Sequence, residues 1–325
     1  MSNDAATTPL PDYSQLPAAP AGGRSAWGLF GAEDSAGLMN LLGPAQAVRA
    51  AALVRTGRTF PLDAPLDYLD PPLYERSPLQ VTITQNRGGK GLDDTYHGFN
   101  PQASSQWDAL GHVAYRADEF YNGATLNDVL HGGRNTIEHW AARGVVTRGV
   151  LLDLERTAIA EGRPYDPGSS HAFSVADLEA ALARTGTTIE QGDVIVLRTG
   201  FMKWYRELSG EERTRIADRT QLTACGIEHT EAMAEFLWNT HAVAVVSDSP
   251  SLEVWPMDWS DEAFPFGCLH QVLIAQFGMG IGELWLLEDL ADACAQDGVH
   301  EFMLTSAPLH LRGGVGSPAN ALAIR

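Results

Sequence analysis

The sequence predicts an α/β protein with a single layered domain around a central β-sheet. Short runs at 149–154, 193–201 and 242–249 are rich in Val, Leu and Ile, which is typical of strands covered on both faces. Between them, the segments 174–186 and 225–240 have apolar residues at helical spacing. This alternation of strands and helices is typical of α/β folds.

The remaining elements follow from the same patterns in chain order. Helical spacing predicts a helix at 44–56, and β-branched, extended stretches predict strands at 59–67 and 80–87. Ser174 is placed to cap the first of the two internal helices. The last predicted strand lies within 301–311.

The chain has 325 residues and a mass of 35.1 kDa, a size at which α/β enzymes commonly keep one core. No internal repeat and no long linker divides it. Residues 1–25 are rich in Ala, Pro and small polar residues, a composition that buries little apolar surface. The sequence therefore predicts a flexible arm over 1–25 and one catalytic domain over 26–325.

Charge and composition exclude several classes of partner. With 22 basic and 41 acidic residues the formal charge is -19, which disfavours nucleic acid and anionic membrane surfaces. No run of about 18 apolar residues could cross a bilayer, and the first residues do not resemble a secretory signal. The three cysteines have no CxxC spacing and are expected to be reduced. A cytoplasmic enzyme with a small-molecule substrate is the expectation.

The stretch 93–123 has the strongest chemical signal. Within eleven residues it contains Gln102, Gln106, Asp108 and His112, and each of these side chains can offer a lone pair to a metal ion. Spacing alone favours a polar loop, in which Asp108 accepts backbone hydrogen bonds and His112 is satisfied in the core, over a metal site.

A second group lies in 269–290, where His270 and Glu283 occur in an otherwise apolar segment expected to form a helix and a turn. Burying both side chains requires a partner, and a shared cation is one such partner.

These residues resemble the metal-binding signature of the cyclase family, which includes bacterial kynurenine formamidase. The signature is H-x-G-T-H-x-D-x-P-x-H, and SSQWDALGH resembles a variant branch with Gln-Trp-Asp. With the family aspartate placed on Asp108, the first two histidine positions fall on Gln102 and Gln106, and the last falls on His112. The later family ligands fall on His270 and Glu283.

Further blocks resemble the same branch, including GVLLDL, SDSPSLEVWP and TSAPLHLRGGVGSPANALAI, so the resemblance covers most of residues 26–325. It implies the layered α/β domain of the family with a central mixed sheet. It also implies a homo-oligomer, most simply a dimer, and the arm at 1–25 could wrap a neighbour.

The resemblance implies a metal-dependent hydrolase that acts on a small amide, lactam or lactone through a metal-activated water. Zinc or manganese is the expected ion, and His112, His270 and Glu283 are the expected catalytic residues. An amide oxygen is a poorer zinc ligand than imidazole, so Gln102 and Gln106 leave the number of bound ions open.

Two other functions stay open on the same scaffold. The site could catalyse dehydration, cyclisation or isomerisation by proton transfer through His112 or His270. The chain could also be a non-catalytic binding protein that retains the fold.

Six further residues are candidates for substrate contact, although core packing or local hydrogen bonding explains some of them equally well. Asp248 in particular could instead cap the turn that follows its strand. The six are His97, Trp107, Tyr115, Tyr121, Asp248 and Trp255.

Overall fold

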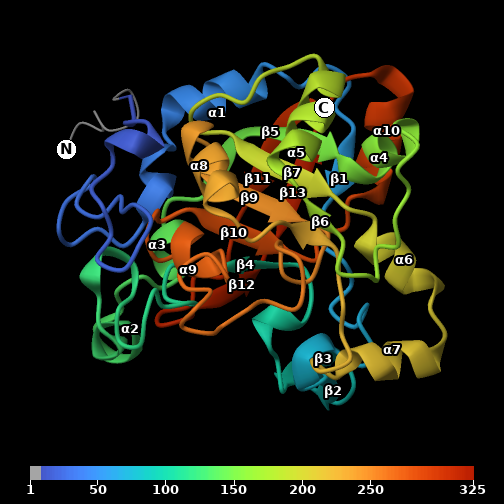
Figure 1. The fold of residues 1–325 in the computed structure, drawn as a ribbon. Coiled ribbons are helices and arrows are strands. Elements are labelled where there is room, and N and C mark those ends of the chain that lie inside the picture. The colour runs from blue at the N-terminus through green and yellow to red at the C-terminus, as the bar shows by residue number, and fades with distance from the viewer. Residues whose placement is uncertain (1–8) are drawn as a thin grey trace.

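A nine-stranded mixed β-sheet forms the centre of the protein, seen in a computed structural model that describes residues 9–325 (Figure 1). The strand order is β1-β13-β11-β5-β7-β9-β10-β4-β12, and the four strands from β5 to β10 are parallel. The outer strands are antiparallel on both sides. The strands are β1 (Thr59–Pro61), β4 (Gln106–Asp108), β5 (Val145–Asp153), β7 (Val194–Arg198), β9 (Ala244–Ser247), β10 (Gly280–Glu283), β11 (Glu301–Ser306), β12 (Gly316–Pro318) and β13 (Ala321–Ile324).

Helices surround the sheet, and α1, α4 and α5 contact the strands β5, β7 and β11 (Figure 1). In residues 9–325 no helix combines the length and the apolar character that crossing a membrane requires. A two-stranded ladder joins β6 (Ala172–Phe173) to β8 (Gly226–Ile227). The helices are α1 (Pro44–Ala51), α2 (Leu126–Gly132), α3 (Glu138–Ala141), α4 (Leu154–Ala160), α5 (Val175–Thr185), α6 (Phe201–Glu207), α7 (Gly210–Ala217), α8 (Glu231–Asn239), α9 (His270–Leu273) and α10 (Glu288–Asp297), with 3-10 turns that include η4 (Leu73–Glu75) and η5 (Pro101–Ala103).

The predicted mixed α/β fold is confirmed, and the apolar runs form its centre. All residues of β7, β9 and β10 are buried, because helices and loops cover both faces of the parallel strands. Ser174 caps α5 as expected, since its hydroxyl accepts the backbone N–H of Asp177.

The segment 269–290 differs from the expected helix and turn. Within 269–290 only the four residues of α9 and the start of α10 at Glu288 are helical, and Glu283 ends the strand β10 instead. Glycine makes this strand possible, because a Cβ at Gly282 would lie 2.6 Å from Cγ1 of Val246 on the neighbouring β9. Glycine also has a low helix propensity, so the helix does not continue.

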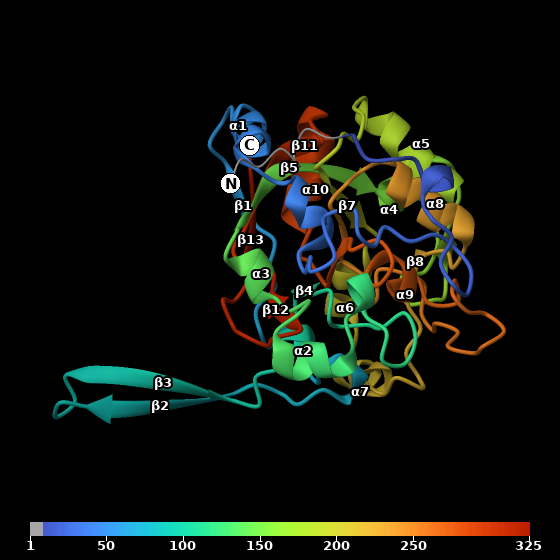
Figure 2. The ribbon, with the colours of Figure 1, turned by 90° about the vertical axis from the view of Figure 1, so that its left-hand side faces the viewer.

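The predicted strand at 80–87 exists, but it lies outside the central sheet. It forms β2 (Gln80–Asn86), which pairs with β3 (Gly91–His97) in a hairpin that projects far from the body (Figure 2). Four apolar side chains on the hairpin are more than half exposed: Val81, Ile83, Leu92 and Tyr96.

The described part of the predicted arm packs on the domain. Tyr13 is 4% exposed, its backbone N–H donates to Asn239, and its hydroxyl donates to Glu231, so this segment is anchored to α8. The indole of Trp238 also donates to the carbonyl of Pro11. Residues 9–25 therefore differ from the expected flexible arm, residues 1–8 lie outside the described residues, and a division at residue 25 stays a prediction.

Candidate active site and metal centre

Strand pairing brings three polar side chains to one face of the sheet. Glu283 of β10 lies opposite Gln106 of β4, and Ile281 lies opposite Asp108. Because alternate residues of a strand point to the same face, Gln106, Asp108 and Glu283 share a face at the end of the two strands. The amide nitrogen of Gln106 donates to Oε2 of Glu283 at 2.5 Å.

His270, in the first turn of α9, completes a buried cluster with Asp108 and Glu283. Its Nε2 lies 3.1 Å from Oε1 of Glu283 and 3.7 Å from Oδ2 of Asp108. One ligand atom from each of the three side chains lies within 4.8 Å of the others. All three are at most 4% exposed.

The cluster contains acceptors that no described hydrogen-bond donor satisfies. Both carboxylate oxygens of Asp108 and Oε1 of Gln106 are buried without a hydrogen bond. An ionised carboxylate in such a place is costly unless a cation compensates it. This donor set, with carboxylate and amide oxygens beside an imidazole nitrogen, therefore fits a divalent metal ion.

The two carboxyl groups of the cluster, Glu283 and Asp108, have pKa values shifted in opposite directions. Burial, together with the charge of Asp108, raises the pKa of Glu283 to about 7. Burial acts the same way on Asp108, but His112 and His270 overcome it and hold the pKa of Asp108 below its usual range. Burial opposes the charged form of His270, yet its close contacts with the carboxylates of Asp108, Glu253 and Glu283 raise its pKa well above the usual value. Two carboxyl groups with different proton affinities thus share one site.

Glu253 holds His270 in place from the opposite side. Its Oε1 accepts the backbone N–H of His270 at 3.0 Å and contacts the ring Nδ1 at 2.5 Å. Its Oε2 accepts the backbone N–H of Leu269 at 2.5 Å and lies 3.1 Å from Nε2 of His229. Burial would raise the pKa of Glu253, but the two histidines lower it to about 2.

Glu253 also lies within ligand distance of Cys268 and His270. Its oxygens already accept hydrogen bonds, unlike those of Asp108, so this second group is a support for His270 rather than a metal site. The backbone is held in left-handed conformations beside both glutamates, with φ of 55° at Leu252 and 58° at Leu284. Such conformations are unfavourable for leucine and concentrate at functional sites.

His112 and Gln102 lie at the rim of the cluster. Nε2 of His112 is 3.5 Å from Oδ1 of Asp108, and its Nδ1 is 3.5 Å from Nε2 of Gln102. Burial lowers the pKa of His112. Gly316 leaves the room for Gln102, because a Cβ there would lie 2.5 Å from its Nε2.

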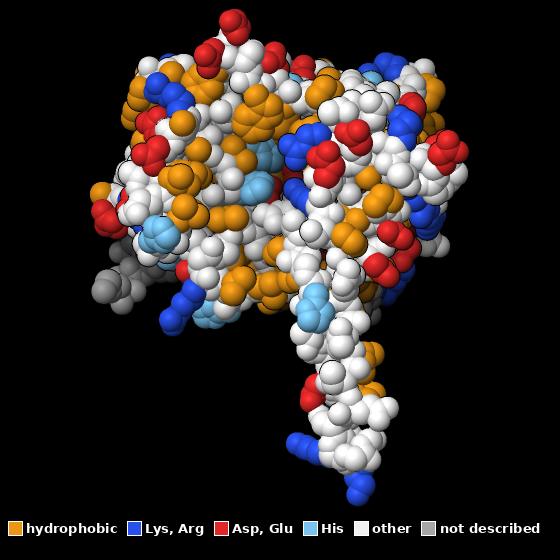
Figure 3. All heavy atoms as spheres, turned by 90° about the horizontal axis from the view of Figure 1, so that it is seen from below, with side chains coloured by type: hydrophobic (Ala, Val, Ile, Leu, Met, Phe, Trp, Pro, Cys, Tyr) orange, Lys and Arg blue, Asp and Glu red, His pale blue; other side chains and the backbone are white. Residues whose placement is uncertain are grey.

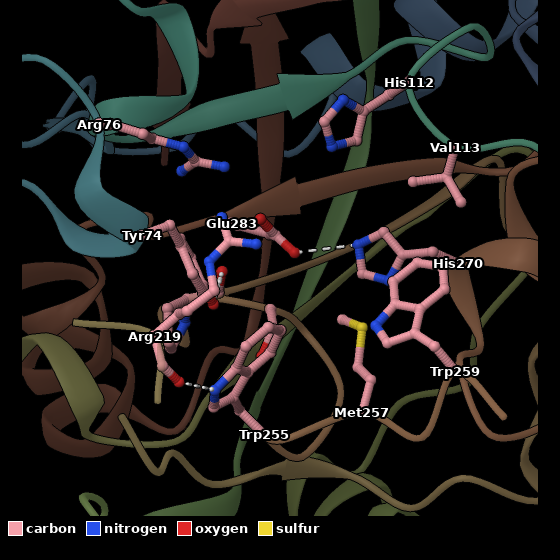
Figure 4. A pocket seen from close by; sticks show the side chains of 12 residues that line it. Tyr74, Arg76, His112, Val113, Arg219, Trp255, Met257, Trp259, His270 and Glu283 are labelled. Carbon is pink, nitrogen blue, oxygen red and sulfur yellow. Dashed lines mark hydrogen bonds and ion pairs between the residues drawn. The ribbon is translucent and has the colours of Figure 1, made fainter. Parts of the chain in front are cut away.

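A cavity of about 230 Å³ opens from His112, His270 and Glu283 to the surface. Figure 3 shows a hollow near the centre of one face, with histidine and acidic side chains inside it and basic side chains beside it. Figure 4 shows two tryptophans and a methionine opposite Arg76. The lining residues are Tyr74, Arg76, His112, Val113, Arg219, Pro250, Ser251, Trp255, Met257, Trp259, His270 and Glu283.

Comparison with known proteins identifies the family. The Cyclase family model matches residues 48–254. A crystal structure described as a novel cyclase is 31% identical, has a TM-score of 0.81, and is matched over 93% of this chain and 99% of that chain. The chain belongs to the cyclase family. No curated protein matches it.

Two isatin hydrolases share the cyclase-family fold with the chain. Isatin hydrolase A from Labrenzia aggregata is 15% identical with a TM-score of 0.58, over 84% of this chain and 94% of that chain. Isatin hydrolase A from Ralstonia solanacearum is 17% identical with a TM-score of 0.56, over 87% and 97%.

Within this cyclase-family protein, the structure places four of the predicted residues outside the cavity. Trp107 points to the opposite face of β4 from Asp108, where its indole donates to Ser306. Tyr115 and Tyr121 are fully buried, with hydroxyls that donate to Gly22 and Asp34 respectively. His97 is exposed at the end of β3. These four residues therefore do not lie where a substrate in the cavity could contact them.

Asp248 also lies outside the cavity lining, and it caps the turn that follows β7 rather than the expected turn after its own strand, β9. Its carboxylate accepts the backbone N–H groups of Thr199 and Gly200 and the Thr199 hydroxyl, at 2.6 to 2.8 Å. Asp248 thereby fixes the turn before α6. Among the six candidates only Trp255 lines the cavity.

Several residues of the site were not predicted from the sequence. Glu253 and His229 are far from the first motif, and Arg76 has no motif around it. The one available signal was Glu253 itself, an acidic residue in the apolar stretch SLEVWP.

Proposed function

We propose that the protein is a metal-dependent hydrolase of a small amide, lactam or lactone. The observation that carries the proposal is the set of unsatisfied, buried acceptors on Asp108 and Gln106 beside His270 and Glu283. The hydrolase names of the isatin hydrolases with the same fold support it as well.

Asp108, Gln106, His270 and Glu283 would hold the ion, with His112 next to them. Zinc and manganese are both compatible with such ligands, and the predominance of oxygen atoms favours manganese. A divalent ion in this place would polarise the substrate carbonyl and lower the pKa of a water molecule towards about 7.

The side chains of the protein supply the proton transfers. Glu283 can serve as the base where it is not a ligand of the ion, since its carboxylate can then accept a proton and return it to the leaving group. His112 lines the cavity and its lowered pKa keeps it neutral at pH 7, so it can act as an acceptor there. Glu253 fixes the ring of His270 by accepting from its Nδ1.

Metal removal tests the proposal directly. The purified protein is expected to contain a divalent ion, and chelation is expected to abolish the hydrolysis of a responsive substrate from a panel of amides, lactams and lactones. Elemental analysis and rates before and after manganese or zinc is returned provide the measurement. Activity that persists without metal would refute the mechanism.

Isomerisation, cyclisation or dehydration stays the alternative reaction, because the same proton-transfer groups would serve it. Product mass separates the reactions, since hydrolysis adds one water, dehydration removes one, and isomerisation conserves mass. Ligand binding without any turnover would favour the non-catalytic alternative.

We also propose a cytoplasmic homodimer in which the hairpin β2–β3 packs against a second copy. A two-stranded hairpin is marginally stable by itself, and Val81 and Tyr96 lie opposite each other on its apolar face. The turn carries Arg87 and Lys90, whereas a second copy has a charge of -19 and offers a complementary surface. The three buried, free cysteines support the reducing location.

Val81→Lys is expected to convert the dimer to a 35.1 kDa monomer in light scattering, because it would place a charge opposite Tyr96 on the apolar part of the face. Thr82→Lys is the matched control on the other face of the hairpin and should leave the dimer intact. A wild-type monomer at micromolar concentration would contradict the proposal.

A further inference from the structure

The cavity contains an arginine, Arg76, that forms no direct ion pair with an acidic side chain of residues 9–325, although its charge acts at longer range on Asp108 and Glu283. We infer that the substrate is an aromatic carboxylate, whose carboxylate group pairs with Arg76 while its ring lies against the tryptophans opposite. This inference rests on the proposed function only in taking the cavity as the substrate site.

Arg76 is half-buried in the cavity wall and makes one hydrogen bond with the described residues, to the carbonyl of Gln102. Among residues 9–325 no carboxylate lies within 4.0 Å of its guanidinium. The other arginine of the cavity, Arg219, differs because it pairs with Glu75 at 3.3 Å. The remaining N–H groups of Arg76 are therefore available to a ligand, in the planar arrangement that matches a carboxylate.

Arg198 is a buried arginine outside the cavity, and its surroundings differ from those of Arg76. Arg198 is 1% exposed and binds the carboxylates of Asp153, Glu155 and Glu288. Arg76 has no such carboxylate partners among the described residues, and its side chain lines the cavity.

The local backbone holds Arg76 in position. The two preceding residues, Tyr74 and Glu75, have φ of 60° and 57°, conformations that are unfavourable for residues with a Cβ. The ring of Tyr74 lies 4.9 Å from the guanidinium carbon, and its hydroxyl donates to the carbonyl of Pro250. The cation–π contact with the ring of Tyr74 thus holds the guanidinium of Arg76 in a fixed position.

Charge and shape together define the ligand. The chain as a whole repels anions with its charge of -19, so an anionic ligand needs a local cation such as Arg76. A divalent ion held by Asp108 and Glu283 would neutralise these nearby carboxylates and leave the charge of Arg76 uncompensated. Opposite Arg76 the cavity is walled by Trp255, Met257 and Trp259, which suit a ring (Figure 4).

A matched pair of probes tests the inference without requiring turnover. Binding of 3-phenylpropanoate and of 3-phenylpropanamide to the metal-loaded protein is measured by calorimetry. The carboxylate is expected to bind at least about tenfold more tightly than the amide at low ionic strength. Arg76→Gln should remove this preference, and Arg55→Gln, at the far edge of the sheet, should keep it.

The outcomes are distinguishable. Equal affinities in the wild type, a preference that survives Arg76→Gln, or no detectable binding of either probe would overturn the inference. If Arg76→Gln does not fold, Arg76→Lys replaces it, because lysine lacks the planar pair of donors and should therefore reduce the preference for the carboxylate. Failure of the hydrolase proposal would show as absent hydrolysis while the preference for the carboxylate persists.

Discussion

Asp108→Asn is expected to remove the bound divalent ion and to lower turnover by orders of magnitude while the fold survives. Asn keeps the shape of the side chain but lacks the charge that compensates the ion. Both oxygens of Asp108 lack hydrogen-bond donors, so the substitution breaks no existing hydrogen bond. His112 and His270 hold the pKa of Asp108 below its usual range, so Asn also removes two favourable charge contacts, and a modest fall in the melting temperature of the metal-free protein is expected.

The decisive measurement combines melting temperature, bound metal and rate on one sample. Asp248→Asn is the matched control, because Asp248 is equally buried but accepts three hydrogen bonds from Thr199 and Gly200. It should lower the melting temperature and leave the metal content of the folded fraction unchanged. An Asp108→Asn protein that keeps its metal and its rate would eliminate the proposed centre.

The second large effect is expected for Glu253→Gln. The carboxylate accepts from the backbone of Leu269 and His270 and contacts the rings of His270 and His229. In glutamine an NH₂ group replaces one of the two carboxylate oxygens. Because both oxygens of Glu253 accept from N–H groups, at least one buried N–H donor would lose its acceptor. Breaking this buried arrangement is expected to cost about 3–5 kcal/mol of unfolding free energy.

The same substitution should weaken metal binding and lower kcat by about 10–100-fold, because His270 loses the carboxylate that orients it. Calorimetry with the metal and rates at several pH values separate this positioning effect from simple destabilisation. Glu288→Gln, which disturbs the ion pair with Arg198, is the control that should destabilise without changing metal affinity. Unchanged metal affinity in Glu253→Gln would restrict Glu253 to a purely structural role.

Local sequence patterns determined the fold class. The apolar runs around 149–154, 193–201 and 242–249 became buried parallel strands, because a strand without polar alternation must be covered on both faces. The capping of α5 by Ser174 is equally local, since the contact spans three residues. The projecting hairpin was not predictable, because the alternation in 80–87 specifies a strand and not its partner.

The sequence also singled out Asp108, His112, His270 and Glu283, because their spacing and the resemblance to a known signature do not depend on distant contacts. It could not place the aromatic candidates, since whether Trp107 faces the cavity or the core depends on the register of β4 against β10.

Only the tertiary structure decided how the site is supported. Glu253 contacts His270, although 17 positions separate them in the sequence. Arg76 lines the cavity because it follows a turn with positive φ values, and no sequence motif predicts that turn. A hydrogen bond or a charge acts over a few ångströms in space, and strand pairing sets those distances independently of separation along the chain. The sequence therefore determined the fold class and the residues able to bind a metal, while the folded chain decided which of them meet and which cation remains available to a substrate.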